Sequence, residues 1–174
     1  MMDDLAQRQL ATIAEFSAAA RMAKRSVWLR GGWAVDFILG RISRPHRDVD
    51  WFAQSKDADV LVDLLRQLGW TEVASAPAEQ QRDLVKGDLD FGIALIRLED
   101  GKPCVAGGPF AGEPWPDTMI SDARHCQLHG VEADVISIEA QIEIKTMTPT
   151  WVPHLARRQK DLTDIMLLES ALTG

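Results

Sequence analysis

The sequence predicts an α/β (α+β) fold in which helices flank a small, mixed, twisted sheet. Three observations predict it. Segments with helical periodicity alternate with short β-prone runs; a strand, a glycine pair and a helix follow one another over residues 26–39; and apolar residues alternate with small or charged ones over residues 83–97. A chain of 174 residues can form one core, and we expect a main domain at residues 1–135 with a C-terminal helical part, residues 136–174, packed on it.

The first half of the chain is predicted to contain three helices and three strands. Apolar residues at helical spacing predict helices over residues 4–24 and 57–68, and a third helix is expected over residues 33–39, directly after a glycine pair. The two later helices end at Gly69 and Gly40, because glycine is the usual helix stop. Strands are expected at residues 26–30, 48–53 and 70–74.

The second half begins with the strongest alternation in the chain. It predicts one strand over residues 83–97, with Leu89, Phe91, Ile93 and Leu95 on one side and Asp88, Asp90, Gly92 and Ala94 on the other. Four glycines and four prolines predict a long loop over residues 99–118, followed by a hairpin within residues 126–135. Ser137 is expected to cap a helix that runs to about Met147. A last helix, residues 154–172, is expected to turn Leu155, Leu162, Ile165, Met166 and Leu168 inward.

The charge balance excludes some partners. Lys and Arg total 19 and Asp and Glu total 26, so the net charge of -7 provides no basic field for a nucleic-acid polymer. No apolar run approaches the ~18 residues that a membrane span needs, and the first residues are acidic where a secretory signal would be basic. We therefore expect a cytoplasmic protein with no membrane partner, and both a monomer and a homodimer remain open.

Asp48 and Asp50 are separated by one residue in a predicted strand, so both carboxylates leave the same face. Aspartate is depleted in strands, and two like charges side by side require a compensating cation. Mg²⁺ suits this spacing, since it takes one or two carboxylates together with water and substrate phosphate. The alternative is an exposed sheet edge, or ion pairs with Arg44 or Arg47.

Asp90 lies on another predicted strand, on a face that Gly92 and Ala94 keep small. If the two strands are neighbours, Asp90 meets Asp48 and Asp50 and forms a three-carboxylate cluster able to hold two metal ions, as phosphoryl and nucleotidyl transfer commonly uses. Asp88 on the same face is an alternative third acid.

The pair Gly31-Gly32 stands between a predicted strand and a predicted helix. Glycine lets backbone N–H groups approach a phosphate, and the positive N-terminal end of the helix attracts it. The alternative is a tight turn that requires a positive φ.

Together these segments resemble a known signature. The stretch Leu29-Arg-Gly-Gly-Trp-Ala-Val-Asp36, followed by Gly40-Arg41 and Arg44-Pro-His-Arg-Asp-Val-Asp50, is similar to that of small antibiotic nucleotidyltransferases of the polymerase-β-like superfamily, in particular the aminoglycoside 2''-adenylyltransferase and lincosamide nucleotidyltransferase families. Gly87-Asp-Leu-Asp90 resembles the strand of the third carboxylate, and Lys160-Asp-Leu-Thr-Asp164 an element of a C-terminal helix. The sequence departs from the lincosamide enzymes after Asp90, where they tend to have a His-Pro pair and this chain has Phe-Gly-Ile-Ala.

The resemblance implies a nucleotidyltransferase fold, with residues 1–135 as the catalytic domain, and roles for particular residues. Asp48, Asp50 and Asp90 would be catalytic and bind Mg²⁺, two ions in all, with Asp90 alternatively taking the proton of the acceptor. Contacts to the nucleotide are expected from Gly31, Gly32, Arg44, Arg47, Lys145 and Lys160. Other interpretations remain: Arg44 and Arg47 neutralise nearby acids, His46 orders its loop, and Lys160 and Arg157 pair with Asp164 and Asp161 on the helix surface.

The implied reaction is the transfer of AMP from ATP to a hydroxyl of a small molecule, an aminoglycoside antibiotic, with release of pyrophosphate. Carboxylates such as Asp88, Glu99 or Asp100 could bind the amines of such an acceptor. A lincosamide, or a protein hydroxyl as in toxin–antitoxin pairs, is the alternative acceptor. A catalytically silent nucleotide-binding module is the alternative from another class.

Overall fold

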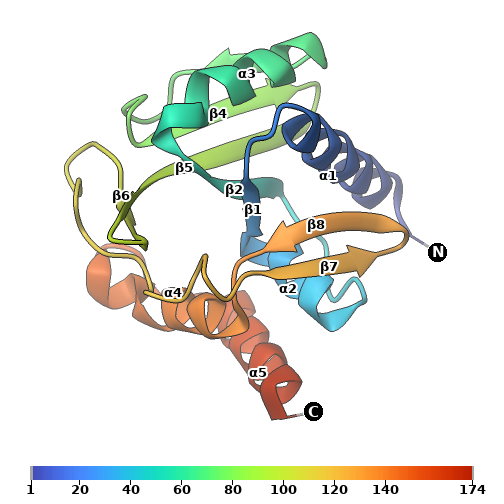
Figure 1. Ribbon diagram of the computed structural model, residues 1–174. Coiled ribbons are helices and arrows are strands. Elements are labelled where there is room, and N and C mark those ends of the chain that lie inside the picture. Colours follow the sequence, from blue (N-terminus) through green and yellow to red (C-terminus); the bar gives the residue numbers. More distant parts are fainter. Residues whose placement is uncertain (1, 174) are drawn as a thin grey trace.

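The computed structural model describes residues 2–173 (Figure 1). The helices within this part are α1 (Asp4–Met22), α2 (Gly31–Leu39), α3 (Ala58–Gln67), α4 (Ile138–Trp151) and α5 (Gln159–Thr173), with a short 3₁₀ turn at Ser55–Asp57. The strands are β1 (Val27–Arg30), β2 (Asp48–Gln54), β3 (Thr71–Val73), β4 (Gln81–Lys86), β5 (Leu89–Glu99), β6 (Lys102–Val105), β7 (Arg124–Leu128) and β8 (Val131–Val135). The predicted mixed α/β fold is confirmed.

The eight strands form one mixed sheet. Their order is β3-β4-β5-β2-β1-β8-β7, and β6 pairs with β5 outside this path. The central strands β2 and β5 are parallel, as are β1 and β8, whereas β1 runs antiparallel to β2. The parallel pairing of β2 and β5 confirms that the two predicted acidic strands are neighbours.

Helices pack on both faces of the sheet (Figure 1). On one face, Phe16 of α1 contacts Trp51 and Phe91 edge to face, with ring centroids 5.0 and 4.9 Å apart, and the buried leucines of α3 join the same core. On the other face, Ala140 of α4 packs in a smaller cluster that contains Phe52. The acidic ends of β2 and β5 lie on this second face, which α4 covers only in part.

The predicted strand over residues 83–97 is wrong, because the structure has a hairpin there. Strands β4 and β5 are antiparallel, with Lys86 opposite Leu89, and the two residues between them form the turn. Gly87 has a φ of 60°, a conformation that glycine adopts without strain. The buried positions change phase at the turn, since Leu84 of β4 lies opposite Phe91 of β5 and both are buried, and the prediction overlooked this change.

The C-terminal helices also differ from the prediction. Helix α4 begins at the predicted cap, where Ser137 Oγ accepts a hydrogen bond from the Ala140 N–H, but it continues through Pro149 to Trp151. Helix α5 begins at Gln159 rather than at residue 154. Of the five residues expected to face inward, Leu168 is buried and Ile165 half-buried, whereas Leu155, Leu162 and Met166 are exposed.

The inward face of α5 is partly acidic instead. Asp161 and Asp164 are both buried, because cationic side chains from other elements meet them. The predicted loop over residues 99–118 contains strand β6, which extends the sheet along β5. Within the described part of the chain, no helix combines the length and apolar character needed to cross a membrane.

Candidate active site

Asp48 and Asp50 open strand β2, and their side chains lie on the face of the sheet that α4 partly covers. Asp48 is exposed and Asp50 is half-buried. Burial and the neighbouring Asp48 carboxylate raise the pKa of Asp50 to about 7, and Arg30 opposes this shift. Asp50 therefore holds its proton far more tightly than an ordinary aspartate does until a cation replaces that proton.

Asp90 lies directly opposite Asp48 in the parallel register, and Gly92 lies opposite Asp50. A Cβ atom at position 92 would lie 2.8 Å from Asp50 Oδ1, so only glycine leaves room for the Asp50 carboxylate in this position. The backbone thus brings the three predicted acids to one place. Within residues 2–173 no three His, Cys, Asp or Glu side chains converge as a complete metal cluster, and Asp90 itself is exposed.

The two glycines have different surroundings at the start of α2. Gly31 has a φ of 73°, and a Cβ there would lie 3.5 Å from Asp50 Oδ2, so the tip of the helix directly faces the acidic pair. At Gly32, a Cβ would come within 2.7 Å of His46 Cε1 and 2.8 Å of Arg44 Nη2. Gly31 therefore leaves the helix tip open, whereas Gly32 makes room for the loop before β2.

A cleft of about 330 Å³ lies between the sheet and the C-terminal helices. Its floor includes Arg30, Gly31, Asp50 and Gln81, and one wall is a face of α4. That wall and the rim are formed by Ile136, Gln141, Ile144, Lys145, Thr148, Arg158 and Asp161. The cleft therefore combines a carboxylate of the acidic pair, a helix tip and three cationic side chains.

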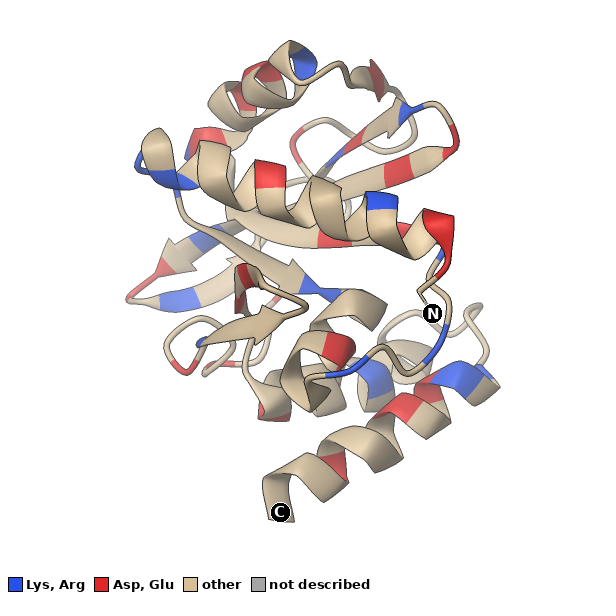
Figure 2. Cartoon of the chain, turned by 90° about the vertical axis from the view of Figure 1, so that its right-hand side faces the viewer, with Lys and Arg blue, Asp and Glu red and all other residues tan. Residues whose placement is uncertain are grey.

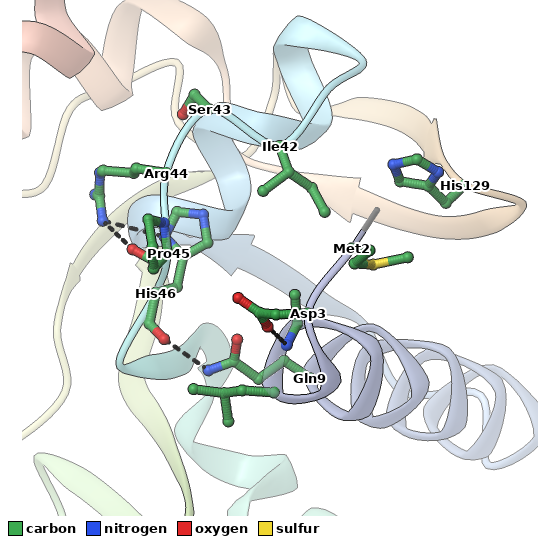
Figure 3. A pocket seen from close by; sticks show the side chains of 11 residues that line it. Met2, Asp3, Gln9, Ile42, Ser43, Arg44, Pro45, His46 and His129 are labelled. Atoms are coloured by element: carbon green, nitrogen blue, oxygen red, sulfur yellow. Dashed lines mark hydrogen bonds between the residues drawn. The ribbon is translucent and has the colours of Figure 1, made fainter.

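The loop before β2 is fixed by buried hydrogen bonds. His46 Nε2 lies 2.5 Å from Asp36 Oδ2, and both side chains are buried. Gln9 of α1 donates to the His46 carbonyl oxygen at 3.0 Å, as Figure 3 shows. These contacts support the prediction that His46 orders its loop. They border a separate hollow of about 430 Å³ that none of the three predicted catalytic acids lines.

Arg44 makes a contact that neither interpretation of the sequence predicted. Arg44 donates from Nη2 to Asp164 Oδ2 at 2.9 Å and from Nε to Asp164 Oδ1 at 3.3 Å, so it joins the loop to helix α5. Asp164 is distant in sequence, and neither a phosphate contact nor neutralisation of the nearby acids predicts it as the partner of Arg44. Arg47 is exposed immediately before β2.

Lys145 and Lys160 approach the site from the two C-terminal helices. Lys145 Nζ lies in the cleft, 3.1 Å from Asp164 Oδ2. Burial and the charges of Arg158 and Arg44 lower the pKa of Lys160, and the charges of Asp161 and Asp48 act against this. Basic and acidic positions gather at the start of α5 in Figure 2.

The ion pairs expected on the surface of the last helix are wrong. Asp164 pairs with Arg44 and Lys145 rather than with Lys160, and Asp161 pairs with Arg158 at 2.9 Å rather than with Arg157. Arg157 instead donates to the Thr146 carbonyl oxygen. Both aspartates turn inward instead, where Asp164 meets cations from other elements and Asp161 meets the neighbouring Arg158.

Two of the carboxylates suggested for an acceptor are already paired. Asp88 lies in the β4–β5 turn and accepts hydrogen bonds from Arg8 at 2.5 and 3.0 Å, so it neither shares the Asp90 position nor lies free. Glu99 pairs with Arg97 at 2.9 Å. A carboxylate that the sequence did not suggest, Asp83, lies opposite Gly92 on β4 and interacts with Asp50.

Sequence reasoning also missed Arg30 and Arg158. Both line the cleft, but each stands in a segment without a motif of its own, and only the fold brings them beside the acids. The position of Arg30 immediately before the glycine pair was the one available signal.

Paired acids on a central strand, a third acid on its parallel neighbour and a glycine-led helix tip define a nucleotidyltransferase fold, and solved structures agree. ANT(2'')-Ia in complex with adenylyl-2''-tobramycin matches with a TM-score of 0.77 and 22% identity, over 95% of this chain and 90% of that chain. The lincosamide adenylyltransferase LnuA, bound to lincomycin, matches with a TM-score of 0.71 and 21% identity, over 94% and 96% of the two chains.

The sequence profile of the aminoglycoside-2''-adenylyltransferases matches residues 12–165, and the chain belongs to this family. A 2''-aminoglycoside nucleotidyltransferase of Klebsiella pneumoniae is 43% identical over 42 residues, which are 24% of each chain. A lincosamide resistance protein of Staphylococcus haemolyticus is 31% identical over 91 residues, 51% of this chain and 55% of that protein. The aligned segments thus span about a quarter and about half of these relatives.

Proposed function

We propose that this protein transfers AMP from ATP to a hydroxyl of an aminoglycoside antibiotic and releases pyrophosphate. The observation that carries the proposal is the register that sets Asp90 beside Asp48, and Gly92 beside Asp50, on one face of the sheet. The cleft next to them has cationic side chains for a triphosphate. Membership of the aminoglycoside-2''-adenylyltransferase family supports this reaction.

Asp48 and Asp50 are the proposed Mg²⁺ ligands, and Asp90 either completes a two-metal site or accepts the proton of the acceptor hydroxyl. Their oxygens are the hard donors that Mg²⁺ prefers, and Asp50 Oδ1 faces the space that a side chain at Gly92 would fill. The residues present therefore fit this ion. When bound, Mg²⁺ neutralises charge on the phosphates.

Other side chains of the chain would bind and orient the nucleotide. Gly31 opens the positive end of α2 toward the phosphates, and Lys145 and Lys160 bring charge from the C-terminal helices. Arg47 is exposed and available beside β2, whereas a phosphate contact from Arg44 would require it to leave Asp164. We propose that Arg44 mainly fixes the C-terminal helices over the cleft.

The division of the chain follows the same proposal. Residues 1–135 would form the catalytic domain, and residues 136–174 a helical part that closes the cleft over the substrates. Helix α4 provides one wall of the cleft, and α5 packs on α2 through the cluster of Val35, Ile138 and Leu168.

A lincosamide is the second candidate acceptor, because the relative from Staphylococcus haemolyticus that aligns with half of this chain is a lincosamide resistance protein. Cationic groups on an aminoglycoside would find an acidic side chain near the reacting centre in Asp83, which lies opposite Gly92. The aminoglycoside therefore remains the first choice.

The test uses the purified protein with Mg²⁺, ATP and a panel of aminoglycosides and lincosamides. Pyrophosphate release and the mass of the antibiotic are measured, with a reaction lacking Mg²⁺ and one lacking acceptor as controls. The proposal expects an AMP adduct on an aminoglycoside, and an adduct on lincomycin alone would favour the second candidate. If no acceptor is modified and no Mg²⁺-dependent ATP binding is found, the chain is a silent member of its fold.

A further inference from the structure

Arg30 is the last residue of β1 and lies opposite Asp50 in the antiparallel register. Its side chain lines the cleft. The guanidinium carbon lies 4.3 Å from the centre of the Phe52 ring and 5.4 Å from that of Trp115. The positive charge of Arg30 therefore lies over two aromatic rings, within the distance of a cation–π contact.

The Arg30 guanidinium has no polar partner among residues 2–173. No hydrogen bond and no ion pair within 4.0 Å joins it to the described part of the protein. This distinguishes it from Arg158, which lines the same cleft and is bonded to Asp161, and from Arg44, which is bonded to Asp164. Burying a cation whose five N–H donors lack acceptors costs free energy, unless an anion binds and accepts hydrogen bonds from them.

The aromatic contacts leave the N–H groups of Arg30 available to an anion. Neither ring contact is a conventional hydrogen bond, so the five N–H donors of the guanidinium still lack an acceptor among residues 2–173. Two of these N–H groups can donate to two oxygens of one phosphate in a planar, bidentate arrangement. Asp50 and Asp48 are the charges that act on Arg30, and cations bound to them would remove their attraction and leave the guanidinium to an incoming anion.

The order of the strands indicates which phosphate group of the nucleotide Arg30 would bind. Across the face of the sheet that lines the cleft, these side chains lie in a spatial order. Arg30 on β1 comes first, then Asp48 and Asp50 on β2, then Asp90 on β5. In phosphoryl transfer the attacking and leaving oxygens lie in line on opposite sides of phosphorus. An acceptor hydroxyl beside Asp90 therefore places the leaving group on the side of Arg30.

We propose that Arg30 is a phosphate-binding residue that donates its N–H groups to the departing pyrophosphate. The acceptor oxygen forms the new bond to the α-phosphorus, the bond from that phosphorus to the bridging oxygen breaks, and pyrophosphate leaves with the electron pair. The proton of the hydroxyl passes to a base, and the charge that develops on the leaving oxygens meets the guanidinium. This inference rests on the proposed function.

Binding of inorganic pyrophosphate with Mg²⁺, measured by calorimetry, tests the inference without catalysis. Arg30→Gln should weaken pyrophosphate binding about tenfold or more, and Arg30→Lys should recover only part of it, because an ammonium has no planar fork. Arg124→Gln, which removes an exposed arginine from β7, should leave it unchanged. Binding of Mg²⁺ alone should be equal or tighter in Arg30→Gln, since a neighbouring positive charge is gone.

The opposite results overturn the inference. Pyrophosphate binding by Arg30→Gln that equals the wild type would assign Arg30 a packing role, as would an equal loss of Mg²⁺ and pyrophosphate binding. If Arg30→Gln does not fold, Arg30→Lys decides, because it keeps the charge and loses the fork, and wild-type affinity in Arg30→Lys then overturns the inference. A wild-type protein that binds neither ATP nor pyrophosphate would overturn the proposed function itself.

Discussion

Asp50 is confined between two glycines. Its Oδ2 atom faces Gly31 at the tip of α2, and its Oδ1 atom faces Gly92 on β5. A Cβ at Gly92 would lie 2.8 Å from Oδ1 and crowd the carboxylate, whereas one at Gly31 would be in ordinary contact, 3.5 Å from Oδ2. The surroundings thus leave the two oxygens open, while burial and Asp48 make their negative charge costly without a cation.

Replacing Asp50 tests its role in the reaction. Asp50→Asn is nearly isosteric and should keep the fold, but it removes the charge that is proposed to bind Mg²⁺. We expect at least a hundredfold loss of kcat, about 2.7 kcal/mol of barrier. Pyrophosphate release measures this, with Asp122→Asn on an exposed loop as the matched control. An unchanged rate would remove Asp50 from the metal site.

The raised pKa of Asp50 also predicts how stability depends on pH. Between its unfolded value near 3.9 and its folded value of about 7, the folded protein keeps a proton that the unfolded chain has released. The free energy of unfolding should therefore fall as pH rises through this window when no metal is present. Thermal unfolding in EDTA from pH 4 to 8 should show this fall, reduced in Asp50→Asn and retained in Asp122→Asn. Equal pH profiles for wild type and Asp50→Asn would contradict it.

At the residue scale, the acids were predictable and their surroundings were not. Strand period alone places Asp48 and Asp50 on one face, because side chains alternate at every residue. The setting of Arg30 depends on Phe52 and Trp115, which come from a strand and a loop far along the chain. No local pattern contains that information.

Helix α5 is the element whose position depends most on charge. Its buried Asp164 receives Arg44 from the loop before β2 and Lys145 from α4. Although burial alone would raise it, these two cations lower the pKa of Asp164 below its ordinary value. Because Leu162 and Met166 are exposed, apolar burial contributes less to α5 than to α1 or α3.

Removing that carboxylate should loosen α5 while the sheet remains folded. Asp164→Ala leaves Arg44 and Lys145 without their shared partner, and we expect a loss of about 3 kcal/mol, as for a broken buried ion pair. Hydrogen exchange should become faster in α5 and change little in β2. Glu169→Gln, an exposed position on the same helix, is the control. Unchanged protection of α5 would show that Leu168 and its neighbours hold it alone.

At the element scale, periodicity located segments better than it located their ends. It gave α1, α3 and β2 within two residues, because each has one buried face. It joined β4 to β5, because it overlooked the change of phase at the two-residue turn, where the buried positions pass from Leu84 to Leu89 and Phe91. It also assumed an apolar inner face for α5, where the fold has Asp161 and Asp164, because the cations that compensate them come from other elements.

The whole molecule carries a net charge of -7, which should favour the approach of a cationic acceptor. For an aminoglycoside, kcat/KM should fall with added salt, by about tenfold between low and moderate ionic strength if the charge steers association. The rate at saturating acceptor should change little. Steady-state kinetics from low to moderate salt check this, with a lincosamide as the less charged comparison. A kcat/KM independent of salt would rule out steering.

The mixed sheet as a whole followed from the combination of motifs rather than from any one of them. The glycine pair, the acid pair and the later acid each have a structural alternative, but one arrangement accounts for all three, with β2 beside β5 and the tip of α2 beside Asp50. A C-terminal helical part packed on the domain was expected, but the contacts that hold it could not be predicted, since Asp161 and Asp164 meet Lys145 of another helix.

The parallel pairing of β2 and β5 has a consequence for the life of the chain. Parallel neighbours cannot be joined by a tight turn, so α3, β3 and β4 must be traversed before Asp90 can reach Asp48. During synthesis, or when the β4–β5 hairpin unfolds, Asp48 and Asp50 are present without Asp90 beside them. Under the proposed roles, such a partly folded molecule does not hydrolyse ATP, because the topology completes the active site only when folding is complete.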